Sequence, residues 1–168
     1  MFKLRSVWLL SAILALMANN SMAGDCRDTL RPLLLENPPD HERLLDAQRL
    51  CAAEAEAGDA DAVYQSALLH LGLLDWNPDA AIPMIQTAAR DGVAEAQYWL
   101  AWQYEEGPLL PNDAELALEW YQRAADDEHY LALDRLASAY RNGELGLATD
   151  ARKAAAMRAR ADRCKAKS

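Results

Sequence analysis

Three stretches of the sequence resemble one another at a regular spacing, and this internal repeat limits the possible folds more than any other feature. They are GDADAVYQSALLHLG, GVAEAQYWLAWQYEEG and EHYLALDRLASAYRNG, at 58–72, 92–107 and 128–143. Matched alanines, tyrosines and closing glycines lie 34–37 residues apart. A repeat of this length is typical of stacked supersecondary units, each of which buries its apolar face against its neighbours.

Each stretch ends in glycine and is followed by a run that starts with a short polar residue. Glycine suits the left-handed backbone position that ends a helix, and asparagine or aspartate accepts the unpaired backbone N–H groups that begin one. We therefore predict a helix, a turn and a second helix in every unit. The predicted helix-ending glycines are Gly72, Gly107 and Gly143, and the predicted helix-starting residues are Asn77, Asp113 and Asp150.

The composition also favours helices, because alanine, leucine, glutamate and arginine dominate and β-branched residues are few. One position works against this preference. Pro78 suits the first turn of a helix that starts after Asn77. Pro83 lies inside the same run, where proline removes a backbone hydrogen bond, so we expect it to bend or shorten that helix.

The recurring residues resemble the pattern of the Sel-one-like repeat (SLR) family, a relative of the tetratricopeptide repeat. The resemblance is strongest over 92–127, good over 128–161 and weaker over 58–92. It implies an all-α fold, a right-handed α-solenoid of about three helix-turn-helix repeats, used for protein–protein contact and without catalytic residues. The residues that carry it are Ala96, Leu100, Tyr104, Gly107, Asp113, Ala117, Trp120, Tyr121, Ala124 and Ala125.

The first 23 residues have the features of a cleaved secretory signal. Two positive residues precede an apolar run at 7–17, which is too short to be a stable bilayer anchor. Small residues at Ser21 and Ala23 favour cleavage after Ala23. We therefore predict a periplasmic or secreted protein with no stable membrane insertion after cleavage.

The mature chain is expected to contain three parts. A helical hairpin at 24–57 caps the array, the repeats occupy 58–163, and a short tail follows at 164–168. Within the hairpin, Cys26 and Cys51 lie at about equal distances from the turn sequence NPPD at 37–40. In an antiparallel hairpin such residues face each other, and export makes disulfides possible, so we predict a Cys26–Cys51 bridge.

The alternative is two unrelated buried thiols. With the bridge formed, Cys164 remains near a basic terminus, either as a thiol or as a residue that exchanges into the pairing. The basic end of the chain suits the favourable placement of cations at a helix C-terminus, and the alternative is a role at a membrane surface.

Trp99 and Trp102 lie outside the internal face of their predicted helix, which is formed by Ala96, Leu100, Ala101 and Tyr104. Glu95, Trp99, Trp102 and Glu106 share another face by helical spacing, whereas Trp120 is at a core position of the family pattern. Solenoids line a concave surface with their first helices, so we predict a partner-binding surface there. Its residues are Asp61, Gln65, Glu95, Trp99, Trp102, Glu106, Leu131, Arg135, Ser138 and Asn142. The alternative is that the two indoles extend the core.

No motif in the sequence indicates catalysis or a cofactor. Nucleophile-elbow, zinc-protease and phosphate-loop patterns are absent, as is C-x-x-C. His41, His70 and His129 stand far apart, without the spacing of metal ligands. We therefore predict a non-enzymatic protein with no catalytic, cofactor-binding or metal-binding residues.

The formal net charge of −9 disfavours nucleic acid as a partner and favours a protein with a basic surface. Exported proteins with this kind of repeat resemble immunity proteins that neutralise toxic effectors, such as phospholipases delivered by type VI secretion. The alternative is an envelope scaffold or regulator of a secretion, polysaccharide or signalling assembly. An enzyme of unrecognised type is a third hypothesis, for which no residue stands out.

Overall fold

The computed structural model describes residues 25–166, which form eight α-helices and no strand. The predicted signal at 1–23 lies outside these residues. A single antiparallel bridge joins Leu71 to Trp76 in a turn. The helices are α2 (Cys26–Leu33), α3 (His41–Glu56), α4 (Ala60–Leu69), α5 (Pro78–Arg90), α6 (Ala94–Glu105), α7 (Ala114–Asp126), α8 (Tyr130–Asn142) and α9 (Ala151–Lys165).

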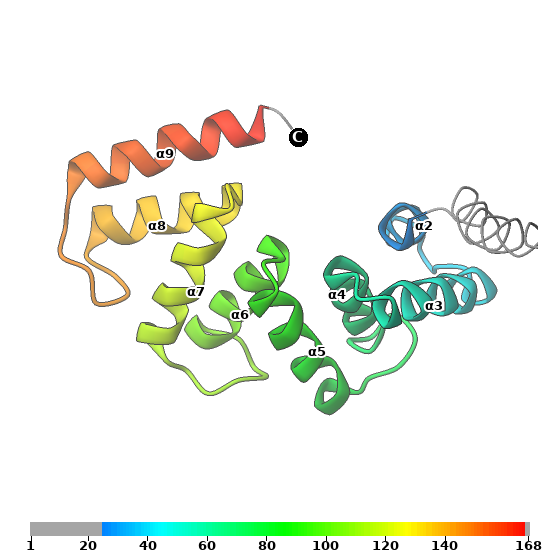
Figure 1. The fold of residues 1–168 in the computed structure, drawn as a ribbon. Helices are drawn as coiled ribbons and strands as arrows, with labels where there is room; N and C mark the ends of the chain where they lie inside the picture. The colour runs from blue at the N-terminus through cyan, green and yellow to red at the C-terminus, as the bar shows by residue number, and fades with distance from the viewer. Residues whose placement is uncertain (1–24, 167–168) are drawn as a thin grey trace, which may run out of the picture.

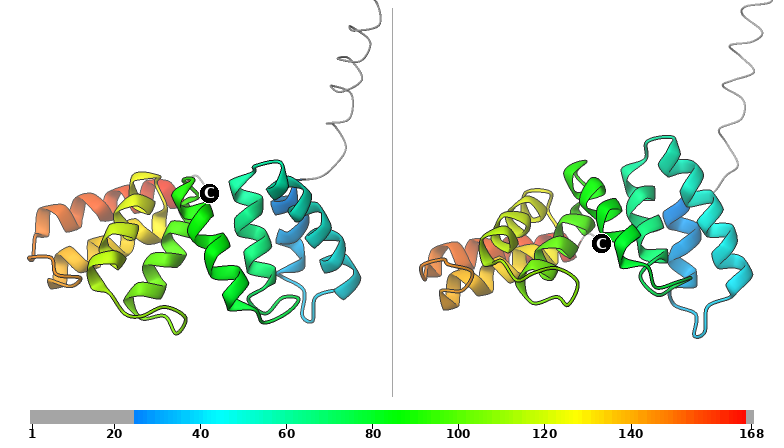
Figure 2. Two further views of the ribbon diagram at one scale, coloured as in Figure 1. Left: turned by 60° about the horizontal axis from the view of Figure 1, so that its bottom comes forward. Right: turned by 90° about the horizontal axis from the view of Figure 1, so that it is seen from below.

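The helices follow one another in pairs from α2 at one end to α9 at the other (Figure 1). Within the array, α4 packs against α5, α6 against α7 and α8 against α9, and each pair contacts the next one along the chain. The two views in Figure 2 show the same succession of pairs. The predicted all-α solenoid of helical repeats is therefore confirmed.

The predicted helix starts are also confirmed. The Asp113 carboxylate accepts hydrogen bonds from the backbone N–H groups of Glu115 and Leu116, both at 3.0 Å. Asp150 does the same for the first turn of α9, and Asn77 for the first turn of α5. The short polar side chains therefore fix where the second helix of each unit begins.

The glycines that close the first helices have different roles. Gly143 ends α8 in the left-handed conformation, with a φ of 73°, as predicted. Gly107 does not adopt this conformation. Glycine is needed there for a different reason, because a Cβ would lie only 2.1 Å from the Gln103 side-chain oxygen. Gly72 belongs to the turn bridged by Leu71 and Trp76 and does not end α4, which stops at Leu69.

Pro83 does not end its helix, because α5 continues to Arg90. The prediction that this proline would shorten the helix is therefore wrong. Likewise, α9 extends through Cys164 to Lys165, so these two residues belong to the last helix rather than to a tail. The Cys164 thiol donates a hydrogen bond to the Glu128 carboxylate at 2.8 Å.

Small residues allow the repeat helices to approach closely, and larger ones fill the space between units. Ala96, Leu100 and Ala101, predicted to be internal, are all fully buried. Trp120 is only half-buried between two core clusters, so the prediction of a core position holds in part. Tyr121, the next residue, is the largest fully buried side chain.

The capping hairpin shares its core with α4 and contains the predicted disulfide. Cys26 and Cys51 are bonded, which joins α2 to α3, and both are buried. The Cys26 backbone N–H also donates to the Glu54 carboxylate at 3.0 Å. A separate leucine cluster, formed by α2, α3 and the end of α4, holds the hairpin against the first repeat.

Candidate partner-binding surface

The predicted surface is centred on the outer face of α6, and we call it the α4–α6–α8 surface. Trp102 is 37% exposed and Glu106 is exposed, whereas Glu95 and Trp99 are half-buried. The internal residues of α6, among them Leu100, point the other way. Of the four residues predicted to share the outer face of α6, Trp102 and Glu106 are exposed and the other two are only partly so.

The Trp102 indole is held by its own helix. Its Nε1–H donates to the Glu106 carboxylate at 3.1 Å. Trp102 belongs to none of the hydrophobic clusters, whereas Trp99 packs against the cluster formed by α4, α5 and α6. The two indoles therefore differ: Trp99 contributes to the core at the edge of the surface, and Trp102 is presented to solvent.

An arginine from the capping hairpin connects two repeats on the α4 side. The Arg27 guanidinium lies 3.2 Å from the Asp61 carboxylate of α4 and 2.8 Å from the Glu95 carboxylate of α6. The pKa of the Asp61 carboxyl is raised above its ordinary value, mainly by partial burial. Arg27 partly offsets this increase, and the negative charge of Glu95 adds to it. Gln65, one turn beyond Asp61, is only 6% exposed and so does not line the surface, which corrects its prediction.

A hydrogen-bonded network borders the α8 side. Arg135 donates to the Glu105 carboxylate at 2.9 and 3.0 Å and to Glu144 at 2.6 Å. Glu105 also accepts from the Tyr121 hydroxyl at 2.8 Å. Burial, followed by this hydrogen bond and charge, raises the pKa of Tyr121. Glu105 is therefore bound by residues of α7 and α8, and Arg135 is bound within the fold.

The remaining predicted residues of α8 differ in exposure. Leu131 is 38% exposed, Ser138 is half-buried and Asn142 is exposed. The Asn142 amide donates to Glu144 at 3.0 Å, so it extends the network of Arg135. Tyr130, beside Leu131, is another exposed aromatic residue that the prediction did not include.

A cavity of about 330 Å³ lies at the edge of the surface, where the starts of α6 and α8 meet the end of α9. Three of its lining residues are acidic, and Glu128 among them already binds Arg160 at 2.7 Å. The His129 ring stacks on Tyr98 with centroids 4.7 Å apart. The lining residues are Ala94, Glu95, Asp127, Glu128, His129, Tyr130 and Cys164.

Two features of the surface were beyond the sequence analysis. Arg27 lies outside the aligned repeats, and the partners of its ion pairs are 34 and 68 residues away in the chain. Glu105 is adjacent to the predicted Glu106 and faces α7 and α8 instead of solvent. Helical spacing could have identified Glu105. With a 100° turn per residue, Glu105 lies on the same side of α6 as Tyr98, seven residues earlier, and not on the side of Trp99.

Residues 25–166 contain no group of three or more histidine, cysteine, aspartate or glutamate side chains that could hold a metal ion. None of the helices in this part of the chain combines the length and the apolar character needed to cross a bilayer.

Comparisons with known proteins agree with this architecture. The sequence profile of the Sel1 repeat matches residues 94–129 and 131–157. A Sel1 repeat protein from Oxalobacter formigenes has a similar crystal structure, with a TM-score of 0.62 and 29% identity over 70% of this chain and 92% of that one. No curated protein matches the sequence.

A second solved structure shows the same fold over almost the whole chain. It is a protective antigen present in uropathogenic Escherichia coli strains, with an SLR fold. The TM-score is 0.65 and the identity 19%, over 96% of this chain and 33% of that one. The fold and its outer surface thus define an α-solenoid repeat protein. The profile shows more specifically that residues 94–129 and 131–157 are Sel1 repeats, and the two solved structures are similar to the chain in fold.

Proposed function

We propose that this protein is an exported, non-enzymatic module that binds a basic region of a partner protein on its α4–α6–α8 surface. Sel1 repeats are generally protein–protein interaction modules, which supports the proposal that this protein binds a partner protein. The export step is supported by the leader-like sequence at 1–23 and by the Cys26–Cys51 disulfide, since such bonds persist in oxidising compartments.

The observation that carries the binding proposal is the exposed Trp102 beside an uncompensated carboxylate. Glu106 accepts a hydrogen bond from this neutral indole and forms no ion pair with any residue of 25–166. An arginine or lysine of a partner could therefore lie over the Trp102 ring and pair with Glu106 at the same time. Tryptophan is also among the residues that contribute most to protein interfaces.

The binding proposal is tested by comparing three tryptophan variants. Trp102→Ala is expected to weaken partner binding by about tenfold or more, with little change in melting temperature. Trp76→Ala is the matched control, because Trp76 is 65% exposed but lies in the α4–α5 turn. Trp99→Ala should lower the melting temperature more than either, since Trp99 packs on the core.

Partner capture from an extract of the envelope, followed by titration calorimetry, measures these affinities. Equal affinities for Trp102→Ala and Trp76→Ala would exclude the α4–α6–α8 surface as the interface. N-terminal sequencing of the protein from fractionated cells tests export separately. We expect the mature protein in the exported fraction to begin at Gly24.

As the specific partner we propose a toxic effector, such as a type VI phospholipase, which the protein would neutralise as an immunity protein. The support is the resemblance of exported SLR proteins to such immunity proteins, together with the acidic composition. A strain that lacks the gene should then be killed by neighbours that deliver the effector, and expression of the gene should restore survival. Unchanged survival, with capture of several envelope proteins and no toxin, would favour the scaffold function instead.

A further inference from the structure

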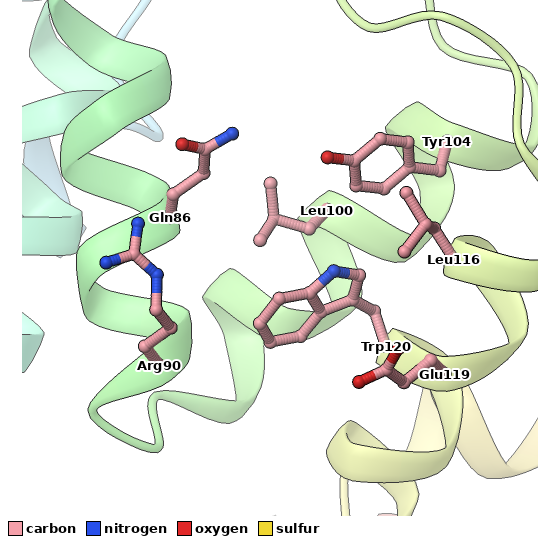
Figure 3. Close-up of a pocket in the computed structure, with 7 residues that line it drawn as sticks. All are labelled: Gln86, Arg90, Leu100, Tyr104, Leu116, Glu119 and Trp120. Atoms are coloured by element: carbon pink, nitrogen blue, oxygen red, sulfur yellow. The ribbon is translucent and has the colours of Figure 1, made fainter.

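A second pocket lies between α5 and α7, the second helices of two successive repeats. It has a volume of about 270 Å³, and α5, α6 and α7 all contribute to its walls. Figure 3 shows the Trp120 indole extending from α7 toward α5, where the Arg90 side chain runs along the helix toward Gln86, with Leu100 of α6 between the walls. The lining residues are Gln86, Arg90, Leu100, Tyr104, Leu116, Glu119 and Trp120.

This pocket is separate from the α4–α6–α8 surface. Leu100 and Trp102 are two positions apart on α6, so their side chains leave the helix about 200° apart. Trp102 marks the outer surface, and Leu100 faces the pocket. A ligand in the pocket would therefore leave the proposed partner-binding surface uncovered.

The polar ends around the pocket are mainly hydrogen-bond donors, and they lack partners. Arg90 forms no ion pair, and the Gln86 amide and Tyr104 hydroxyl form no side-chain hydrogen bond, with any residue in the described range 25–166. In Figure 3 the Tyr104 hydroxyl points across the pocket toward α5, and the Trp120 indole nitrogen is on the side of the ring nearest Leu100 and Tyr104. These groups surround an apolar floor.

The single carboxylate of the pocket does not compensate Arg90. Glu119 accepts a hydrogen bond from Arg123 at 2.6 Å, and the Arg123 guanidinium also lies 4.7 Å from the centre of the Trp120 ring. The charge of Glu119 is thus paired within α7, and Arg90 remains a cation without an anion. In a chain with a net charge of −9, this is a local site for a negative group.

We infer that the pocket binds an acidic peptide segment, with an apolar side chain against Leu116 and Trp120 and a carboxylate on Arg90. A carboxylate accepts several hydrogen bonds, which matches the donors of Arg90, Gln86, Tyr104 and Trp120. The volume lies just below the range of typical small-ligand pockets, so it suits one or two side chains. The partner chemistry is opposite to the basic region proposed for the outer surface.

The inference is tested with two matched probes, N-acetyl-Leu-Glu amide and N-acetyl-Leu-Gln amide. The indole Nε1–H resonance of Trp120, identified with Trp120→Phe, is followed by NMR during titration of the ¹⁵N-labelled full chain. We expect the glutamate probe to move this resonance with an affinity about fivefold or more above that of the glutamine probe. The Trp102 resonance should remain in place.

Two arginine variants make the test specific. Arg90→Gln should abolish the preference for the glutamate probe, whereas Arg141→Gln should retain it. Arg141 is an exposed arginine of α8 that does not line the pocket. The inference is overturned if Trp120 does not respond at millimolar probe, if both probes act alike on the unmodified chain, or if Arg90→Gln keeps the preference. The outer-surface proposal is unaffected by these results, because its variants are at other residues.

Discussion

The two ends of the solenoid are stabilised in different ways. At the N-terminal end, α2 has only eight residues, and it is joined to α3 by the Cys26–Cys51 bond and a leucine cluster. At the C-terminal end, α9 has 15 residues but buries only Ala154 and Ala161. Its arginines instead reach back, as when Arg160 donates to the Ala125 carbonyl oxygen at 2.7 Å.

The difference shows how a repeat array can end. A terminal pair has a neighbour on one side only, so part of its surface is not covered by another unit. The short α2 compensates with a covalent bond that restricts the unfolded chain. The longer α9 keeps a polar outer face and uses ion pairs and hydrogen bonds, which salt weakens. The two ends should therefore respond to different perturbations.

The largest expected effect is at the N-terminal end. Replacing Cys26 and Cys51 together by alanine should lower the free energy of unfolding by about 3–4 kcal/mol, because the loop they close is no longer restricted. Urea unfolding measures the loss, and hydrogen exchange should locate it in α2 and α3. Cys164→Ala is the control and should cost much less. A loss of protection spread evenly to α9 would contradict the difference between the ends.

A smaller effect is expected where the C-terminal end joins the array. Glu105→Ala should cost about 1–3 kcal/mol, because it leaves the buried Tyr121 hydroxyl without its acceptor and the Arg135 guanidinium with Glu144 alone. Urea unfolding of Glu106→Ala provides the comparison, since Glu106 is exposed and should matter less. Equal losses in the two variants would mean that the Glu105 network does not stabilise α8.

The smallest expected effect depends on pH. His129 accepts a hydrogen bond from the Ala132 N–H at the start of α8, and burial lowers the pKa of its imidazole. The unfolded chain therefore takes up this proton first as the pH falls. The contribution of His129 is complete above its ordinary pKa of about 6.5 and is lost as the pH falls through the lowered value.

His129→Asn isolates this contribution, because asparagine also caps a helix but does not titrate in this range. As the pH decreases from neutral, the free energy of unfolding of the original chain should fall relative to that of the variant. Urea unfolding at a series of pH values measures it. A constant difference would show that the imidazole titrates alike in the folded and unfolded states.

The sequence was sufficient for features set by local patterns. Helical spacing predicted the buried residues Ala96, Leu100 and Ala101, and the capping side chains at Asn77, Asp113 and Asp150 predicted the helix starts. The symmetric position of Cys26 and Cys51 about one turn predicted the disulfide. Each of these depends on residues within one helix or one hairpin, where spacing determines which side chains can meet.

Features that depend on how the units stack could not be predicted in this way. Gln65 matches the surface positions by alignment but is buried, whereas Trp120 matches a core position but lines a pocket. Glu105 is bound by Arg135 from the next repeat, 30 residues away. Glu105 is bound and the adjacent Glu106 is exposed, although they are neighbours in the sequence. Alignment of the repeats does not show which of the two carboxylates packs against the next repeat.

Arg27 gives the disulfide a consequence beyond the hairpin. It directly follows Cys26 in α2, and its guanidinium holds Asp61 and Glu95, which belong to two different repeats. Because the bond fixes the start of α2, it helps to hold the backbone that positions this arginine between the two carboxylates. A sulfur pair outside the repeats thereby supports an ion-pair contact that joins two of them.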